Sequence, residues 1–213
     1  SIIYNANGGT GSMSTQRVNG AVSNTLSSNT FTREHYVFTG WNTSSNGSGT
    51  PYGNGATIPA NTINKYLNLY AQWALNGWIF VNESTSTSLE DQQWSYYNTG
   101  IRIENGFHVL PDTYGDSRLY YIVDGIAQLG WVKDSNDNWF YFSKSDADGN
   151  GYVDCGAYVN GTYEIDGVNY TFDENGICIN PFNNTGHYIN SNQSAMRQKD
   201  IDLIKKYFSG YIY

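Results

Sequence analysis

The chain has 213 residues, of which only 14% are charged, and its formal net charge is −8. The charge is uneven, because residues 75–189 carry sixteen acidic against four basic side chains, whereas residues 1–74 carry Arg17, Arg33 and Lys65 against Glu34. An acidic surface repels phosphates and attracts cations, which excludes nucleic acid as a partner. No apolar run reaches eighteen residues, so we expect no transmembrane segment.

The composition predicts a mainly β protein of the cell surface or the secreted fraction. Gly, Asn, Ser, Thr and Tyr are abundant, and these residues suit short strands joined by tight turns. The sequence opens on a strand-like segment, SIIYNAN, without a signal peptide, so we expect a fragment of a longer protein. We expect three parts, at residues 1–74, 75–180 and 181–213.

Residues 1–74 contain three expected strands, at 1–7, 36–42 and 67–73, separated by glycine-rich turns. In the second strand, YVFTGWN, strict alternation places Tyr36, Phe38 and Gly40 on one face. The same alternation places Val37, Thr39 and Trp41 on the opposite face.

The order of segments in this part carries a family resemblance. YNANGGTGSM, then TFTREHYVFTGWNTSSNGSGTPYGNGATI, then LNLYAQW resembles the Listeria–Bacteroides repeat, the internalin B-repeat type of module. The resemblance implies a small β-grasp-like domain that acts as a spacer or interaction unit without catalysis. We expect Trp41 and Trp73 to pack in its core rather than bind a ligand.

Residues 75–180 contain a repeated half-hairpin pattern, clearest in GWVKDSNDNWFYF and GTYEIDGVNYTF. The glycines that open these units are Gly77, Gly106, Gly130 and Gly161. One hairpin cannot bury its own aromatic side chains, so neighbouring hairpins must stack and share them. The pattern therefore predicts a β-hairpin solenoid, with Asp124-Gly125 and Asn175-Gly176 as turn dipeptides that take positive φ.

The aromatic positions of these units resemble the choline-binding, or cell-wall-binding, repeats of Gram-positive surface proteins. By that resemblance the first expected ligand site combines Trp94, Tyr96 and Phe107, and Trp139 with Tyr141 is the second. Ring faces of this kind attract a quaternary ammonium group through cation–π contacts. The sequence departs from the repeat pattern at Leu119 and Thr162. The alternative is that these rings form the core between hairpins.

A calcium-loop pattern occupies residues 146–154, DADGNGYVD. Its candidate oxygen ligands are Asp146, Asp148, Asn150, the Tyr152 carbonyl and Asp154. The twelfth position is Ala157 instead of the bidentate glutamate, and we expect no flanking helices. A weak calcium site and a plain acidic turn therefore both remain open, and no cofactor is required.

Cys155 and Cys178 are the only cysteines. They lie at non-equivalent places in successive units, so stacking alone does not align them. An oxidising environment allows a disulfide, and the spacing leaves both the bridged and the free state open.

Residues 181–213 predict a short helix. Ser194 is its expected N-cap, Gly210 ends it, and its apolar stripe consists of Met196, Ile201, Ile204, Tyr207 and Phe208. Such a helix would cover the open end of the hairpin array. The alternative is that it binds a partner or opens another domain.

No catalytic constellation is recognisable, because His35, His108 and His187 lie in three separate segments and the acidic residues lie mainly in turns. We therefore expect a non-catalytic module for attachment or presentation at a Gram-positive cell wall. Its expected partners are a wall polymer, a choline-bearing teichoic acid or another protein. Two alternatives remain: a purely structural stalk or adhesin, and an ancillary region of a wall hydrolase or toxin.

Overall fold

The computed structural model describes residues 1–81 and 88–181, and the expected C-terminal helix lies outside this range. Backbone contacts divide the chain into two compact units. The first comprises Ser1–Gly77 with Tyr97–Ile101, and the second comprises Trp78–Tyr96 and the chain from Arg102 onward. The described residues form small sheets and one turn of 3-10 helix, η1 (Leu89–Asp91), which confirms the predicted mainly β fold. None of this described helix is long or apolar enough to cross a membrane.

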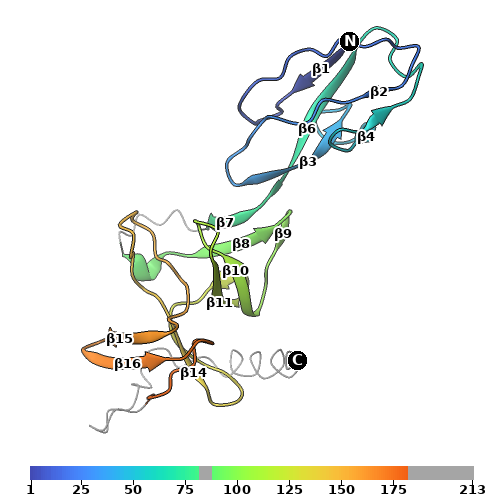
Figure 1. Ribbon diagram of the computed structural model, residues 1–213. Coiled ribbons are helices and arrows are strands. Elements are labelled where there is room, and N and C mark those ends of the chain that lie inside the picture. Colours follow the sequence, from blue (N-terminus) through green and yellow to red (C-terminus); the bar gives the residue numbers. More distant parts are fainter. Residues whose placement is uncertain (82–87, 182–213) are drawn as a thin grey trace. The chain divides into compact units, whose positions relative to one another are not determined.

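The first unit is built on a four-stranded sheet in the order β1-β6-β3-β4. Its strands are β1 (Ile2–Asn5), β6 (Leu67–Leu75), β3 (Tyr36–Asn42) and β4 (Pro51–Tyr52). β1 pairs in parallel with one edge of β6, and β3 pairs antiparallel with the other edge of β6. The long β6 therefore lies at the centre of the sheet, as Figure 1 shows.

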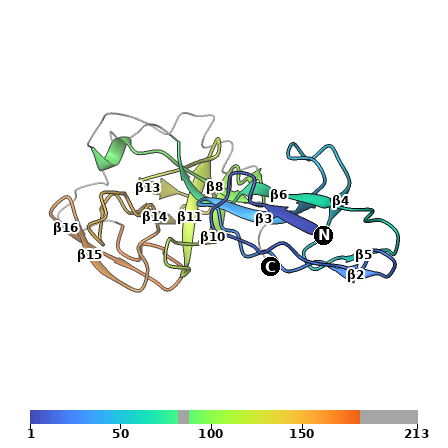
Figure 2. The ribbon, with the colours of Figure 1, turned by 90° about the horizontal axis from the view of Figure 1, so that it is seen from above.

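A small second sheet completes the first unit. It consists of β2 (Asn24–Thr25) and β5 (Thr57–Ile58), which pair antiparallel and lie together in Figure 2. Ile58 is fully buried, and Leu26, directly after β2, is almost fully buried. This sheet thus supplies apolar side chains to the same core as the larger one.

The core of the first unit surrounds Trp41, which is 1% exposed, as expected for a packing residue. The strict alternation predicted for this strand is wrong, because β3 carries a register shift between Phe38 and Gly40. Thr39 is the extra residue, and Gly40 takes φ +144°. The extra residue of this bulge breaks the alternation, so Trp41 lies on the same face of the sheet as Phe38. The centroids of their rings are 4.9 Å apart.

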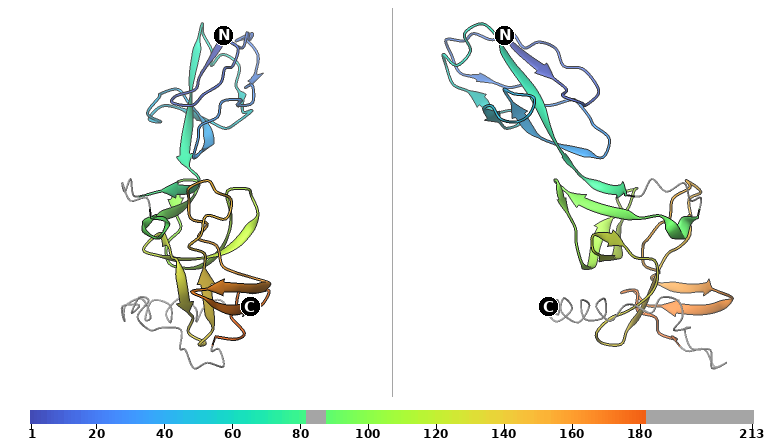
Figure 3. Two further views of the ribbon diagram at one scale, coloured as in Figure 1. Left: turned by 90° about the vertical axis from the view of Figure 1, so that its left-hand side faces the viewer. Right: turned by 180° about the vertical axis from the view of Figure 1, so that it is seen from behind.

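The remaining strands form successive hairpins, each opened by one of the four predicted glycines. The pairs are β7 (Gly77–Phe80) with β8 (Trp94–Asn98), β10 (Gly106–Pro111) with β11 (Ser117–Val123), β13 (Gly130–Lys133) with β14 (Trp139–Phe142), and β15 (Gly161–Ile165) with β16 (Val168–Phe172). Two short strands, β9 (Ile101–Arg102) and β12 (Ile126–Ala127), extend the first two pairs. Figure 3 shows the last two hairpins in yellow to orange.

The tight turns use residues with positive φ, but not at every predicted dipeptide. Asp124-Gly125 has φ values of +52° and +78°, and Asp166-Gly167 closes β15 onto β16 with +50° and +80°. In Asn175-Gly176 only Gly176 has positive φ, at +83°. That dipeptide belongs to a wider turn in which the Gly176 N–H donates to the carbonyl of Asp173, so its assignment as a two-residue hairpin turn is wrong.

Aromatic side chains are shared between consecutive hairpins, as the solenoid prediction requires. One cluster joins β10 and β11 to β13 and β14, with Phe142 fully buried at its centre. Another joins β13 and β14 to β15 and β16, where Trp131 contacts Tyr170 at 4.8 Å and stacks on Phe172 at 5.9 Å. Within residues 78–81 and 88–181, the second unit is therefore a row of hairpins that share separate aromatic clusters.

Candidate functional site: an aromatic and acidic pocket

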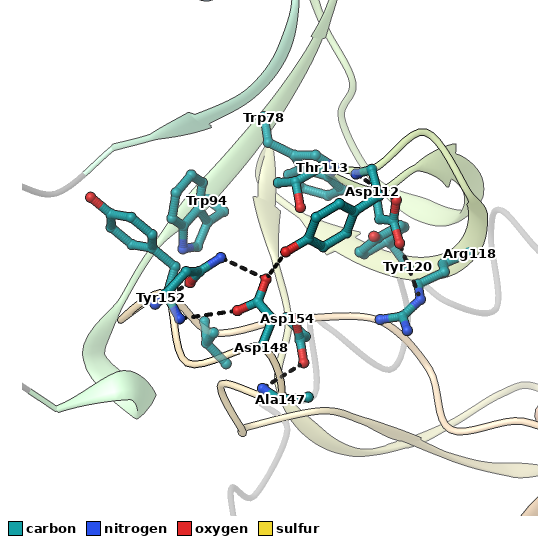
Figure 4. Close-up of a pocket in the computed structure, with 13 residues that line it drawn as sticks. Trp78, Trp94, Asp112, Thr113, Arg118, Tyr120, Ala147, Asp148, Tyr152 and Asp154 are labelled. Carbon is teal, nitrogen blue, oxygen red and sulfur yellow. Dashed lines mark hydrogen bonds and ion pairs between the residues drawn. The ribbon is translucent and has the colours of Figure 1, made fainter.

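A cavity of about 210 Å³ opens in the second unit, and we call it the aromatic pocket. Its walls contain two tryptophans, three tyrosines, three aspartates and one arginine. They come from β7 and β8, from the β10–β11 hairpin, and from the loop of residues 146–154 (Figure 4). Pockets that combine aromatic faces with a few polar groups are typical ligand sites.

The back of the aromatic pocket is rigid because Trp78 is held on several sides. Its ring lies 4.5 Å from that of Tyr120 and 5.1 Å from that of Tyr96. Its Nε1 donates a hydrogen bond of 2.9 Å to the Pro111 carbonyl oxygen. Tyr120 is 2% exposed, and burial raises the pKa of its hydroxyl.

The opposite side of the pocket is formed by Trp94 on β8 and Tyr152 on the loop. Their rings meet edge to face at 5.2 Å and 89°, and Figure 4 shows them together at one side of the cavity. Phe80 supports Trp94 at 5.1 Å. Tyr152 is 47% exposed, so its ring is accessible to a ligand.

The loop that carries Tyr152 is folded by its own polar side chains. Asp146 accepts hydrogen bonds from the backbone N–H groups of Asn150 and Gly151, at 2.9 and 2.7 Å. Outside the loop, Gln92 donates to the Gly151 carbonyl at 2.8 Å and accepts from the Val153 N–H at 2.9 Å. These bonds fix the loop against the segment that leads into β8.

A second link joins the loop to the β10–β11 turn. The Tyr114 hydroxyl donates a 2.6 Å hydrogen bond to an Asp148 carboxylate oxygen. This hydrogen bond and the charge of Asp148 raise the pKa of Tyr114, and the same hydrogen bond lowers the pKa of Asp148. Tyr114 is 73% exposed, so the link spans the solvent side of the pocket.

The pocket carries a net negative charge. Asp112, Asp148 and Asp154 face a single guanidinium, Arg118, whose Nε lies 3.5 Å from the Asp112 carboxylate. Asp154 accepts a hydrogen bond from the Ala147 N–H at 3.2 Å. Carboxylates beside ring faces favour ammonium groups and hydroxyl donors over anions.

The first predicted ring set is divided between two places. Trp94 lines the pocket, and Tyr96 lies behind it against Trp78. Phe107 packs instead against Tyr121 at 4.7 Å and Phe140 at 4.8 Å, in the cluster between the second and third hairpins. The reason is that β10 faces β13 and β14, so its ring enters a different hairpin interface.

The second predicted pair lies in the last hairpin cluster. Tyr141 is 7% exposed, and burial raises its pKa to about 12. Trp139 is half-buried beside Trp131, and the Lys133 ammonium group lies 5.7 Å from its ring centroid. The Lys133 ammonium group therefore lies over the Trp139 ring, where the prediction places a ligand cation.

The predicted calcium ligands lie together in one loop, but their side-chain oxygen atoms accept hydrogen bonds from other groups of the protein. Asp146 and Asn150 accept backbone N–H groups, and Asp148 accepts the Tyr114 hydroxyl. Within residues 1–81 and 88–181, no three carboxylate, imidazole or thiol side chains are arranged to hold a metal ion. Calcium binding by this loop stays a prediction.

The two cysteines are free thiols in different clusters. Cys155 packs near Tyr120 and Val153, and Cys178 packs with the last two hairpins. Both are almost fully buried. Burial raises the pKa of Cys155 to about 12 and also raises that of Cys178.

Several pocket residues carried no functional signal in the sequence. Trp78 directly follows Gly77, which opens the first repeat unit, whereas Asp112 and Tyr114 lie in an ordinary turn, PDTYGD. The calcium-loop pattern indicates a role for the Tyr152 carbonyl oxygen and none for its ring. The three pocket segments are far apart in sequence, so periodicity could not group them.

The fold and the pocket describe a small β module of the first unit joined to an aromatic hairpin array. Residues 1–72 match the model of the Listeria-Bacteroides repeat domain. Such repeats occur in extracellular and surface proteins. A search of curated proteins gave no match to the chain.

Proposed function

We propose that this chain is a non-catalytic module of a secreted or surface protein, which attaches or presents that protein at a Gram-positive cell wall. The observation that carries the proposal is the aromatic pocket, where Trp78, Trp94 and Tyr152 surround acidic groups. The match of residues 1–72 to a surface-type repeat supports an extracellular setting. The ligand is a choline group or a wall glycan.

The electrostatics of the pocket favour binding over catalysis. A general acid needs a carboxyl pKa raised towards the working pH, but the pKa of Asp148 is lowered by the Tyr114 hydroxyl. Asp112 is paired with Arg118. The thiols of Cys155 and Cys178 are buried with raised pKa values, which removes them as nucleophiles.

Ligand titrations followed by tryptophan fluorescence test this proposal, since Trp78 and Trp94 line the pocket. Choline, tetramethylammonium and N-acetylglucosamine oligomers serve as probes. We expect binding by at least one of them, and Tyr152→Ala should weaken it by about 0.5–2 kcal/mol, the value of one ring contact. The absence of binding by all three probes would rule the proposal out.

A matched control is available in the first unit. Tyr66 is also an exposed tyrosine, at 60%, and it lies outside the pocket. Tyr66→Ala should leave ligand affinity unchanged. Equal losses for the Tyr152 and Tyr66 variants would mean that the pocket is not the binding site.

The second candidate function is a structural stalk or adhesin. It is favoured by the number of rings that are buried between hairpins, of which Tyr121, Phe142 and Phe172 are each at most 2% exposed. A chain with no ligand affinity but an intact hairpin array would support it. The adjoining sequence of the parent protein would test the third alternative, an ancillary region of a wall hydrolase or toxin.

A further inference from the structure

A second, larger cavity lies next to the aromatic pocket. It has a volume of about 700 Å³, and we call it the serine groove. The two cavities have Arg118, Ala147 and Asp154 in common as wall residues. They therefore adjoin within the second unit.

The serine groove is lined by groups that exchange hydrogen bonds with hydroxyls. Ser117, Ser143 and Ser145 contribute hydroxyl groups, and Glu174 and Asn175 contribute further polar side chains. Ser143 and Ser145 lie 2.8 Å apart through their oxygens. A wall of hydrogen-bond donors and acceptors matches a polyhydroxylated ligand better than an apolar one.

Aromatic and apolar surfaces continue along the groove. Tyr158 and Tyr163 stack at 4.2 Å and 17°, and both line it. Val109, on β10, is 68% exposed at the groove wall. The C–H faces of sugar rings pack on such surfaces, while their hydroxyls reach the polar groups between them.

The combined charge selects among polymers. Asp112, Asp148, Asp154 and Glu174 line the two cavities, against the guanidinium of Arg118, which already faces Asp112. Anionic chains are therefore repelled. Neutral and amine-bearing chains are tolerated or attracted.

We propose that the two cavities together bind a neutral or amine-bearing glycan chain. One sugar ring lies against Trp94 and Tyr152 in the aromatic pocket, and the following sugars lie along the serine groove. This inference rests on the proposed function and names its ligand class. It excludes a free choline group as the complete ligand.

The test is a length series measured by isothermal titration calorimetry on the whole chain. The probes are monosaccharides and β-linked tetrasaccharides of glucose, glucosamine and N-acetylglucosamine, with a tetrasaccharide of galacturonic acid as the anionic comparison. At least one neutral or amine-bearing tetrasaccharide should bind about tenfold or more tightly than its monosaccharide, because the added sugars fill the groove. The anionic tetrasaccharide should bind more weakly than the others.

Two variants separate the cavities. Val109→Trp places a large side chain in the groove, so it should weaken the tetrasaccharide and leave the monosaccharide unchanged. Tyr152→Ala should weaken both. The matched control is Ile101→Trp, since Ile101 is an exposed aliphatic strand residue, at 72%, that lines neither cavity.

The outcomes distinguish this inference from the proposed function. If choline binds and no tetrasaccharide does, the glycan inference is overturned while the binding function stands. If neither binds, both are overturned. The inference is also overturned if monosaccharide and tetrasaccharide bind equally, if Val109→Trp weakens both alike, or if an oligolysine peptide binds more tightly than every tetrasaccharide.

Discussion

Replacing Phe142 by alanine tests whether hairpins of the second unit depend on one another. Phe142 is fully buried, and its ring lies 6.0 Å from that of Phe107 and 6.2 Å from that of Tyr121, both in the preceding hairpin. Phe142→Ala removes the phenyl ring and leaves a cavity, because the neighbouring rings are fixed on their own strands. The expected loss of unfolding free energy is about 3–5 kcal/mol. For a unit of this size that lowers Tm on the order of 10 °C or more.

The assay combines thermal unfolding with hydrogen exchange resolved by segment. Amides of β10–β11 and of β13–β14 should lose protection together, while those of the first unit keep it and serve as an internal control. Phe142→Leu, which retains most of the buried volume, should cost less than the alanine variant. Loss of protection confined to β13–β14, with β10–β11 unchanged, would refute the idea of a shared aromatic core.

Three further predictions follow from individual contacts. Cys155 and Cys178 should not react with Ellman's reagent in the folded protein at about pH 8, because burial keeps their thiols protonated. Both thiols should react in denaturant. Fast reaction of the native protein would contradict the buried, free state. The hydrogen bond between Tyr114 and Asp148 should persist above the ordinary Asp pKa of 3.8 and weaken as the pH falls through the lowered pKa of Asp148. It should weaken again as the pH rises through the pKa of Tyr114, which lies above 10.0. NMR shifts of both side chains that stay unchanged across either pH range would contradict this prediction. Gly40→Ala should destabilise the first unit by roughly 2 kcal/mol, because alanine is strained at this positive φ and its Cβ would lie 2.9 Å from a β4 carbonyl oxygen. The measurement is chemical denaturation, and a midpoint equal to that of the parent chain would contradict this prediction.

Much of the fold was visible in the sequence because its signals are local. Alternating segments and turn glycines located β1, β3 and β6, and the glycines that open the repeat units each begin a strand. The bulge at Thr39 was not visible, because no local pattern separates it from regular alternation. Its cause is tertiary, namely the packing of Phe38 and Trp41 into one core.

The candidate site was only partly predictable. The resemblance to choline-binding repeats predicts Trp94 as a ligand-site residue, but the rings that contact it are Phe80 and Tyr152 rather than Phe107. Which neighbour a hairpin faces depends on stacking direction, and sequence spacing does not contain that information. The sequence also marks the acidic loop, but the loop's place in the pocket wall depends on tertiary hydrogen bonds to Gln92, which no local pattern predicts.

The aromatic pocket is assembled from segments that begin at Trp78 and end at Asp154. A chain truncated before residue 146 would keep the hairpins β7–β8, β10–β11 and β13–β14 but lose one wall of the cavity. Binding of the proposed ligand would therefore report that the first two hairpins and the loop of residues 146–154 have packed together, and it would provide a functional readout of complete folding of this part of the second unit.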